Sequence, residues 1–340
     1  MKENFWEGRK VSITGANGFI GSWLTETLSE KGAYLTILIK KDSPIGTDSI
    51  KHLMGKVKIV YGNIKDSSSV EKLVKDKEFV FHLAAVTQVI YAKNNPREAF
   101  EVNANGTLNV LEALRKNKEN AFLVFASTDK VYGEPKQLPI TEDHPLLSKS
   151  PYDAAKLAAD RLVHSYHLTY GINSGIVRWS NTIGGRDSNF LRVVPDFINS
   201  VIKQTPPTIR GNGKHIRDYM YVLDSVNGIM SIGEKSNVSN GDVFNIGTEK
   251  PTSVLELANL IIKLMGKEGK MRPVVLNKDT SGEIDKQYLS SKKAVEKLGW
   301  KPAYNLEQSL KETIKWYKSN PKWSEVMERV KNYYKLEAKW

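Results

Sequence analysis

Short apolar runs alternate with helix-like amphipathic stretches through the first half of the chain. The apolar runs predict buried strands at 10–14, 34–39, 58–61, 79–83, 122–125 and 175–177. Runs this short and continuous are typical of strands that are covered on both faces, as in a parallel sheet. Strands that alternate with helices therefore predict an α/β fold built on a doubly wound parallel sheet, which binds ligands at the carboxyl ends of its strands.

Beyond residue 180 the pattern becomes mixed. A loop is followed by a helix at 195–201, a strand within 210–222, a further strand at 243–247 and a helix at 255–265. These elements predict a smaller mixed α/β region. In the tail, one helical face is apolar, which predicts a packing stripe rather than a binding site. Its side chains are Trp323, Val326, Met327, Val330, Tyr333 and Tyr334.

A glycine-rich turn follows the first strand and precedes a helical pattern. Glycines at these places let the backbone turn tightly and approach a pyrophosphate, which then sits at the N-terminus of the helix. A glycine motif is strong evidence when it lies between a strand and a helix, so we predict a dinucleotide site here. Its residues are Gly15, Asn17, Gly18, Phe19, Ile20 and Gly21.

Tyr152 and Lys156 form the second chemical motif. They stand four residues apart at the start of a helical pattern, so they share one face. We expect the Lys156 ammonium to lower the pKa of the Tyr152 phenol, which then serves as a base for an alcohol. Thr128 ends a buried strand and brings a hydroxyl to the same edge. A Tyr-x-x-x-Lys pair is common on surface helices, but its place after the glycine turn favours the functional interpretation.

Composition and charge narrow the function classes. The chain of 340 residues is 40% hydrophobic and has no cysteine, which excludes disulfides and thiolate metal sites; we predict no metal. The formal charge of +12 invites a nucleic-acid interpretation, but the lysines are interleaved with acidic residues, so we predict no nucleic-acid partner. No apolar signal segment or run of ~20 apolar residues occurs, which predicts a soluble cytoplasmic protein with no membrane partner.

The spacing Gly15-x-x-Gly18-x-x-Gly21, together with Tyr152 and Lys156, resembles the extended branch of the short-chain dehydrogenase/reductase superfamily, which acts on nucleotide sugars. The resemblance runs from about residue 6 to about residue 318. It implies a Rossmann sheet, a nicotinamide cofactor, a nucleotide-diphospho-sugar substrate and a homodimer formed through two helices. We predict three parts: a Rossmann domain at 1–180 to which about 218–248 returns, a substrate region at 181–217 and 249–320, and a C-terminal helix at 321–340.

The end of the second strand bears on the choice of cofactor. NAD-dependent relatives usually carry an acid where Ile39 stands, and here Lys40 and Lys41 follow. Two ammonium groups suit a 2′-phosphate, which favours NADP; Asp42 keeps NAD open as the alternative. The resemblance also assigns cofactor contacts or support to Asn63, Ile64, Leu83, Ala84, Ala85 and Asn103. His82 lies inside an apolar strand and is interpreted as a core residue.

The resemblance implies a substrate site in the second region. The residues that match substrate-binding positions are Thr87, Asn181, Arg210 and Arg217. Arg217 is the strongest of these, because a planar guanidinium suits the oxygens of a pyrophosphate.

Asp129 and Lys130 follow Thr128 and bear on the type of reaction. Relatives that are 4-epimerases usually carry small residues there, whereas 4,6-dehydratases carry an acid and a second proton-transfer group. An Asp-Lys pair is similar to that of CDP-glucose 4,6-dehydratases, while residues 211–222 look closer to the dTDP-glucose enzymes. We predict a CDP-glucose-like 4,6-dehydratase; a 4-epimerase, a dTDP-glucose 4,6-dehydratase and a non-catalytic nucleotide-sugar binder are the alternatives.

The resemblance also implies a role for each catalytic group. Tyr152 takes the proton of the 4-hydroxyl, Thr128 orients that hydroxyl, and Lys156 adds positive charge nearby. A neutral Lys130 then removes the C5 proton, and a protonated Asp129 donates to the departing C6 hydroxyl.

Overall fold

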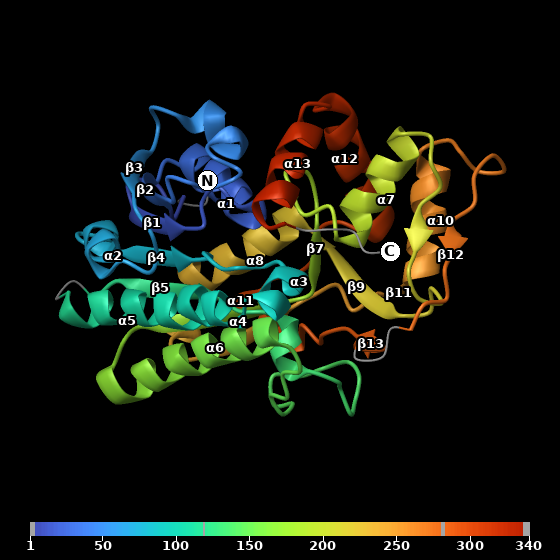
Figure 1. The fold of residues 1–340 in the computed structure, drawn as a ribbon. Helices are drawn as coiled ribbons and strands as arrows, with labels where there is room; N and C mark the ends of the chain where they lie inside the picture. Colours follow the sequence, from blue (N-terminus) through green and yellow to red (C-terminus); the bar gives the residue numbers. More distant parts are fainter. Residues whose placement is uncertain (1–3, 118–119, 280–282, 336–340) are drawn as a thin grey trace.

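A computed structural model of the chain describes residues 4–117, 120–279 and 283–335. Its centre is a seven-stranded sheet in the order β10-β6-β5-β4-β1-β2-β3, and every neighbouring pair is parallel (Figure 1). The strands are β1 (Lys10–Thr14), β2 (Tyr34–Ile39), β3 (Lys58–Tyr61), β4 (Phe79–His82), β5 (Phe122–Ala126), β6 (Ser174–Trp179) and β10 (Val243–Ile246). The predicted doubly wound parallel sheet is confirmed.

The two faces of the sheet are buried in separate cores, which explains the continuous apolar runs. Phe79 and Phe81 of β4 belong to one core cluster, and Val80 between them belongs to the other. The first face is covered by α1 (Phe19–Glu30), the 3₁₀ helix η1 (Asp48–Leu53), α8 (Val222–Glu234) and α11 (Lys292–Leu298), with α9 (Ser236–Ser239) beside α8. The second face is covered by α2 (Ser67–Val74), α5 (Gly106–Lys116) and α6 (Pro151–Tyr170).

Short helical segments link the strands to these layers. They are α3 (Val89–Asn94), α4 (Pro96–Phe100), the π-helical turn η2 (Glu101–Asn105) and the 3₁₀ turn η3 (Asp129–Tyr132). Figure 1 shows α4, α5 and α6 gathered on one side of the sheet, and α3 near its carboxyl end. These turns matter for function because η3 and α3 border the candidate active site.

A second region lies against the carboxyl ends of the strands. Its strands are β7 (Asn181–Ile183), β8 (Thr208–Ile209), β9 (Ile216–Tyr221), β11 (Pro251–Ser253), β12 (Val274–Val275) and β13 (Lys286–Gln287). Its helices are α7 (Val193–Ile202), α10 (Val254–Leu264), α12 (Leu306–Ser319) and α13 (Trp323–Tyr333). Here β9 pairs with β11, β13 and β7, β8 pairs with β12, and the helices share a second core. This arrangement agrees with the predicted mixed α/β region, and the domain boundaries themselves stay a prediction.

The C-terminal helix is shorter than its predicted range of 321–340. Residues 336–340 lie outside the described residues. Trp323, Val326 and Met327 are buried in the second core, so packing accounts for this part of the stripe. Tyr333 and Tyr334 do not belong to that core and lie at the cleft of the candidate active site.

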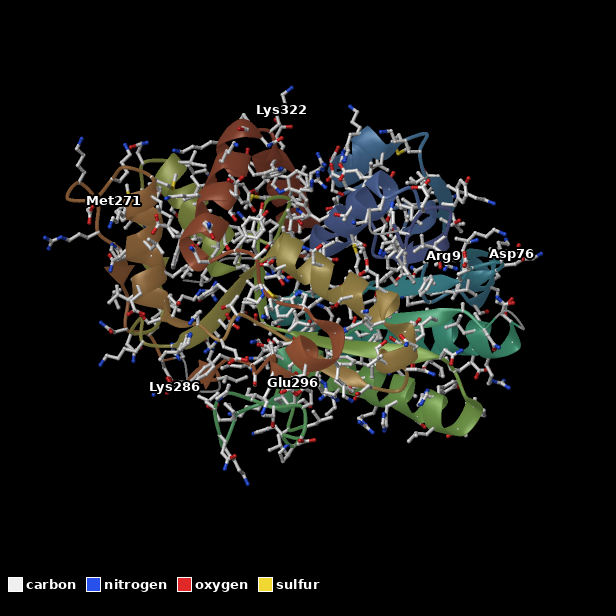
Figure 2. The ribbon with its side chains drawn as sticks, turned by 180° about the vertical axis from the view of Figure 1, so that it is seen from behind. Arg9, Asp76, Met271, Lys286, Glu296 and Lys322 are labelled. Atoms are coloured by element: carbon white, nitrogen blue, oxygen red, sulfur yellow. The ribbon has the colours of Figure 1, made fainter. Side chains whose placement is uncertain are left out.

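Charged side chains are spread over the surface. Figure 2 shows nitrogen-ended and oxygen-ended side chains interspersed around the molecule, and many of them form exposed ion pairs such as that between Lys65 and Glu98. Within residues 4–117, 120–279 and 283–335, no helix has the length and apolar character needed to cross a bilayer.

Candidate active site

A cleft of about 310 Å³ lies at the carboxyl edge of the sheet. Most residues predicted to bind a cofactor line it: Gly15, Asn17, Gly18, Phe19, Ile20, Gly21, Lys40, Asn63, Ile64, Leu83, Ala84, Ala85, Tyr152 and Lys156. Two predicted residues differ, since Lys41 is exposed outside the cleft and Asn103 is buried behind it. Thr87, predicted to bind substrate, also lines the cleft. The local motifs of the first domain are thus brought together in one place.

The glycine turn has the shape that a pyrophosphate requires. Gly15 has φ +69°, and a Cβ there would lie 2.8 Å from the backbone of Leu83 and Ala84. Helix α1 begins after Gly18, and its N-terminus carries neither a side-chain cap nor an acidic residue in the first turn. Its free amide donors and the positive end of the helix dipole favour an anion. The residues present therefore fit the diphosphate of a dinucleotide.

Buried hydrogen bonds fix the wall of the cleft beside β4. The hydroxyl of Thr14 accepts from the backbone N–H groups of Leu83 (3.2 Å) and Ala84 (3.1 Å). His82 contacts Thr14 through Nδ1 (2.6 Å) and Thr107 through Nε2 (3.0 Å). Burial, with a smaller effect of Lys156, lowers the pKa of His82 to about 3. His82 is therefore a satisfied core residue, as predicted.

Asn103 supports the site from behind. Its Oδ1 accepts from the N–H of Val86 (2.7 Å), and its Nδ2 donates to the carbonyl of the same residue (3.2 Å). Val86 follows Ala84 and Ala85 in the cleft wall. Asn103 thus holds the loop after β4 in place, which matches a supporting role better than direct contact.

Tyr152 and Lys156 face the cleft from the first turns of α6. Ser150 and Asp153 form a capping box, with Asp153 N–H donating to Ser150 Oγ (3.2 Å) and Ser150 N–H to Asp153 Oδ2 (3.1 Å). This cap fixes where the helix begins. The Lys156 ammonium donates to the carbonyl of Ala126 at the end of β5 (2.6 Å). The predicted pair is therefore anchored to both helix and sheet.

The expected lowering of the Tyr152 pKa is wrong for the chain on its own. Burial raises the pKa of Tyr152 to about 12, and the positive charge of Arg192 offsets part of that rise. Burial also lowers the pKa of Lys156 to about 7, against the attraction of Asp160. Desolvation favours the neutral form of both groups. Activation of the phenol therefore needs positive charge beyond that of Lys156.

Asp129 and Lys130 lie together at the end of β5, in the turn η3. Thr128 accepts from the N–H of Lys130 (3.3 Å) and donates to Asp129 Oδ1 (3.2 Å). The ammonium of Lys130 lies 3.2 Å from Asp129 Oδ2. The three side chains form one connected group next to Ser127, which lines the cleft, although they are not themselves part of its lining. Their catalytic roles stay a prediction.

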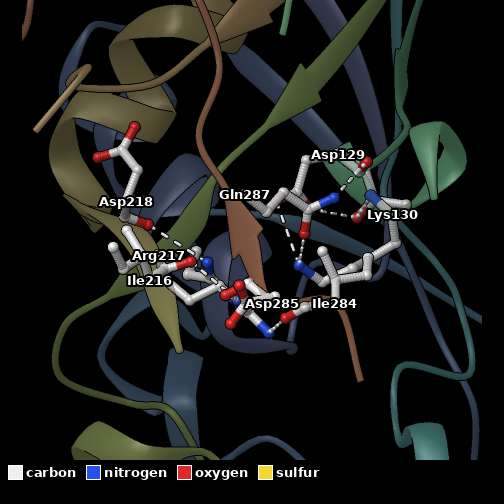
Figure 3. A network of polar contacts seen from close by, with 10 residues as sticks. Asp129, Lys130, Ile216, Arg217, Asp218, Ile284, Asp285 and Gln287 are labelled. Carbon is white, nitrogen blue, oxygen red and sulfur yellow. Dashed lines mark hydrogen bonds and ion pairs between the residues drawn. The ribbon is translucent and has the colours of Figure 1, made fainter. Parts of the chain in front are cut away.

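Gln287 of β13 clamps this group from the other region. Its Oε1 accepts from Lys130, and its Nε2 donates to the backbone carbonyl of Asp129 (3.0 Å), as Figure 3 shows. The side chain is fully buried. Sequence reasoning missed Gln287, because it sits on a two-residue strand far along the chain and no local motif marks it.

Arg217 occupies the neighbouring strand, in register with Gln287. Its guanidinium donates to the carbonyls of Ile216 (2.8 Å), Ile284 (2.6 Å) and Asp285 (3.1 Å) (Figure 3). The guanidinium thus holds the segment that carries Gln287 in place. Its predicted contact with a pyrophosphate stays a prediction. Burial lowers the pKa of Lys130; Asp129 opposes this shift and the positive charge of Arg217 adds to it.

The remaining predicted substrate residues lie on other elements of the second region. Asn181 on β7 donates to the carbonyl of Asp218 (3.3 Å). Arg210 follows β8, and burial lowers its pKa while Glu283 and Asp196 oppose this. Their contact with a substrate stays a prediction.

A buried polar network forms the floor beneath these groups. Asp160 of α6 accepts from Ser127 Oγ (2.7 Å) and from Arg178 Nε and Nη2 (2.9 and 2.7 Å). Arg178 Nη1 donates to the Tyr132 hydroxyl (3.0 Å), which donates to Asn245 (2.7 Å). The network ties β5, α6, β6 and β10 together. Its members are far apart in the sequence, so no spacing revealed it.

A family model described as GDP-mannose 4,6 dehydratase matches residues 13–313. The chain belongs to this family. As a member of the GDP-mannose 4,6 dehydratase family, it is an enzyme of the nicotinamide-dependent group that includes nucleotide-sugar dehydratases, epimerases and decarboxylases. The predicted resemblance to the extended dehydrogenase/reductase branch is thereby confirmed, while closeness to the CDP-glucose enzymes stays a prediction.

Several relatives of this family member are similar over nearly the whole chain. A protein of Methanocaldococcus jannaschii named putative UDP-glucose 4-epimerase is 34% identical over 91% of this chain and 99% of its own. The crystal structure of UDP-glucose 4-epimerase from Thermotoga maritima with UDP-glucose has a TM-score of 0.84 at 28% identity, covering 92% and 99%. The crystal structure of dTDP-glucose 4,6-dehydratase from Bacillus anthracis in complex with NAD has a TM-score of 0.83 at 25% identity. The match covers 94% of this chain and 100% of that one.

Among residues 4–117, 120–279 and 283–335, no group of three or more His, Asp or Glu side chains is placed to hold a metal ion.

Proposed function

We propose that the protein is a nucleotide-diphospho-sugar 4,6-dehydratase, which converts a hexose into its 4-keto-6-deoxy form. The observation that carries this proposal is the Asp129–Lys130 pair, 3.2 Å apart beside Thr128 and clamped by Gln287. Oxidation of a 4-hydroxyl needs a phenol and a hydroxyl, whereas elimination of water needs two further groups for protons at C5 and C6. The pair supplies these two groups.

Oxidation at C4 belongs to the cofactor side of the site. Tyr152 takes the proton of the 4-hydroxyl, and Thr128, which hydrogen-bonds to Tyr152, orients that hydroxyl. A nicotinamide held by the glycine turn would supply the redox chemistry of the cycle and, in its oxidised form, positive charge. Because burial keeps the phenol neutral, that charge and the charge of Arg192 would favour the phenolate at the step where Tyr152 acts as a base.

Elimination belongs to the Asp129–Lys130 pair. This step requires a neutral amine on Lys130 and a protonated acid on Asp129. Burial supports the neutral amine, because it lowers the pKa of Lys130. Lys130 then removes the C5 proton, acidified by the 4-ketone, and Asp129 protonates the C6 hydroxyl as water leaves. When hydride is returned to C6, Lys130 gives its proton back to C5, and the proton that Tyr152 took from the 4-hydroxyl replaces the one that Asp129 lost.

The edge of the cleft beside β2 bears on the cofactor. Lys40 lines it and supports NADP, but its ammonium lies 3.2 Å from Asp42 Oδ2, while Lys41 is exposed outside. One ammonium next to one carboxylate suits the 2′-hydroxyl of NAD as well as it suits the phosphate of NADP. A related 4,6-dehydratase structure contains NAD. We therefore propose that the cofactor is a tightly held nicotinamide dinucleotide. Titration of the protein with NAD and with NADP shows which of the two binds more tightly.

CDP-glucose is the first substrate to test. The resemblance of the Asp129-Lys130 pair to CDP-glucose 4,6-dehydratases supports it, and dTDP-glucose is the next candidate because of residues 211–222. Arg217 and Arg210 provide positive charge for the pyrophosphate in the second region.

We also infer a homodimer formed through α5 and α6, which pack on each other. Sedimentation velocity of the protein tests this inference.

A 4-epimerase is the second candidate, favoured by the names of similar relatives. The deciding experiment incubates the protein with CDP-, dTDP-, UDP- and GDP-sugars and determines the mass of each product. Loss of one water supports the dehydratase, whereas unchanged mass with an altered sugar overturns it in favour of the epimerase.

A further inference from the structure

The last turn of helix α13 lies at the mouth of the cofactor cleft. Val330, Tyr333 and Tyr334 line the same cleft as the glycine turn and Lys40. Figure 1 shows the helix in red, next to the blue first part of the chain. We propose that Tyr333 and Tyr334 are cofactor-retaining residues, which close the ribose end of the cleft and keep a dinucleotide bound between catalytic cycles. This inference rests on the proposed function.

Tyr333 makes the contact on the β2 side. Its hydroxyl accepts from Lys40 Nζ (2.8 Å) and lies 3.5 Å from Asp42 Oδ2, and the Lys40 ammonium is also 5.5 Å from the centre of its ring. The segment after β2 is where a Rossmann fold contacts the ribose of a dinucleotide. Tyr333 therefore belongs to the group of side chains around the ribose position.

Tyr334 makes the contact on the opposite side. Its ring meets that of Tyr91 edge-on, with centroids 4.8 Å apart. Tyr91 lies on α3, follows the loop after β4, and lines the cleft. Burial raises the pKa of Tyr334 to about 12, so its hydroxyl stays neutral. The two tyrosines thus span the cleft from β2 to α3.

The two ends of α13 are held in different ways. At its start, Trp323 is buried in the second core and donates to the carbonyl of Asp187 (3.3 Å). Near its end, Arg329 pairs with the half-exposed Asp48 of η1 and donates to the carbonyl of Pro44 (3.3 Å). Exposed ion pairs are weak, whereas a buried core is not. The start of α13 is therefore the more firmly anchored of its two ends.

Retention suits the proposed chemistry. A 4,6-dehydratase takes a hydride from C4 and gives it back at C6, so the cofactor ends each cycle as it began and need not leave. An aromatic wall made of the last turn of α13 keeps the dinucleotide in place. Affinity differences of this kind fall mainly on the dissociation rate.

The experiment compares Tyr333→Ala/Tyr334→Ala with Asn332→Ala, an exposed control on the same turn. NADH and NADPH are bound to each protein, displaced by excess oxidised cofactor, and followed by fluorescence. We expect the double variant to release the cofactor at least about tenfold faster, as for the loss of aromatic anchors, and the control to match wild type. The thermal midpoint of the cofactor-free protein should be nearly the same in all three.

The outcomes separate the two proposals. Wild-type protein that binds neither cofactor overturns the proposed function together with this inference. Wild-type protein that binds a cofactor, with a double variant that releases it at the wild-type rate, overturns the retention role alone. A double variant whose cofactor-free form melts much earlier, with an unchanged release rate, assigns the tyrosines to packing and overturns the inference as well.

Discussion

The two walls of the site are built in different ways. One wall lies at the carboxyl edge of the sheet. It is built from short local motifs, such as the Gly15–Gly21 turn and the Tyr152/Lys156 pair. The facing wall comes from the end of the chain, where Gln287 reaches Asp129 and Lys130, and Tyr333 reaches Lys40. In the proposed function, the first wall serves the oxidation of the alcohol. The second wall serves the elimination of water and, by our inference, the retention of the cofactor.

This difference teaches where function-specific groups are found. A glycine turn or a helical pair is encoded within a few residues, because the local backbone positions it. A clamp such as Gln287 depends on two strands of a second region meeting a turn of the first. Variants on the two walls should therefore affect different steps.

The largest loss of activity is expected from a change on the first wall, at the carboxyl edge of the sheet. Tyr152→Phe removes the group that takes the proton from the 4-hydroxyl, and we expect the first hydride transfer to fall by ~10²- to 10⁴-fold with cofactor binding retained. Single-turnover absorbance of the nicotinamide measures the step, and cofactor titration is the control. Turnover near the wild-type rate would show that the oxidising base lies elsewhere.

Asp129→Asn and Lys130→Met should separate the half-reactions. Each removes one proton-transfer group of the elimination and leaves Thr128, Tyr152 and Lys156 intact. We expect water loss to fall by about 10²-fold or more, so that reduced cofactor accumulates with a 4-keto-hexose that has kept its C6 hydroxyl. Nicotinamide absorbance and sugar mass measure both. If both variants convert substrate without a trapped ketone, the pair is not part of an elimination and the epimerase gains.

Gln287→Leu tests the second wall, and its expected effect on the rate of elimination is smaller. The change removes a buried partner of Lys130 and Asp129, so we expect elimination to slow by about tenfold while oxidation at C4 is unchanged, because a misplaced proton-transfer group loses efficiency. The exposed neighbour variant Lys286→Ala is the matched control. A leucine variant that slows both half-reactions equally would mean that Gln287 stabilises the fold rather than positions the pair.

The smallest effect is expected at the ribose end. Lys40→Ala should weaken NADP binding several-fold, by about 1 kcal/mol as for a partly exposed ion pair, and leave NAD nearly unchanged. Lys41→Ala is the control, since Lys41 is outside the cleft. Fluorescence titration with both cofactors measures the difference. Equal changes for NAD and NADP in the Lys40 variant would remove the basis for an NADP preference.

The strands of the parallel sheet were predictable because burial on both faces leaves continuous apolar runs, as in Phe79–His82. The grouping of the predicted cofactor residues in one cleft was predictable because they follow those strands. Gln287 was not, since a lone polar residue on a two-residue strand has no periodicity. The Tyr152 pKa was misjudged for a different reason. The sequence shows the spacing to Lys156 but not the desolvation, which is the larger effect.

The tail shows how one pattern can serve two purposes. Its apolar spacing predicted packing, and Trp323, Val326 and Met327 do pack in the second core. Two tyrosines at the end of the same stripe line the cleft instead. A phenol is apolar by composition and polar at its tip, so periodicity alone does not distinguish a core side chain from one at a binding site.

The buried Asp160–Arg178 pair constrains any attempt to redesign this enzyme. Both side chains are almost fully enclosed, and the pair also holds Ser127 and Tyr132, neighbours of the reacting groups. Changing one partner alone leaves an enclosed charge and costs roughly 3–5 kcal/mol, a large share of a typical protein's stability. Directed evolution by single steps is thus blocked at the floor of the site. New substrate preferences should be sought in the loops above it, or by exchanging both partners at once.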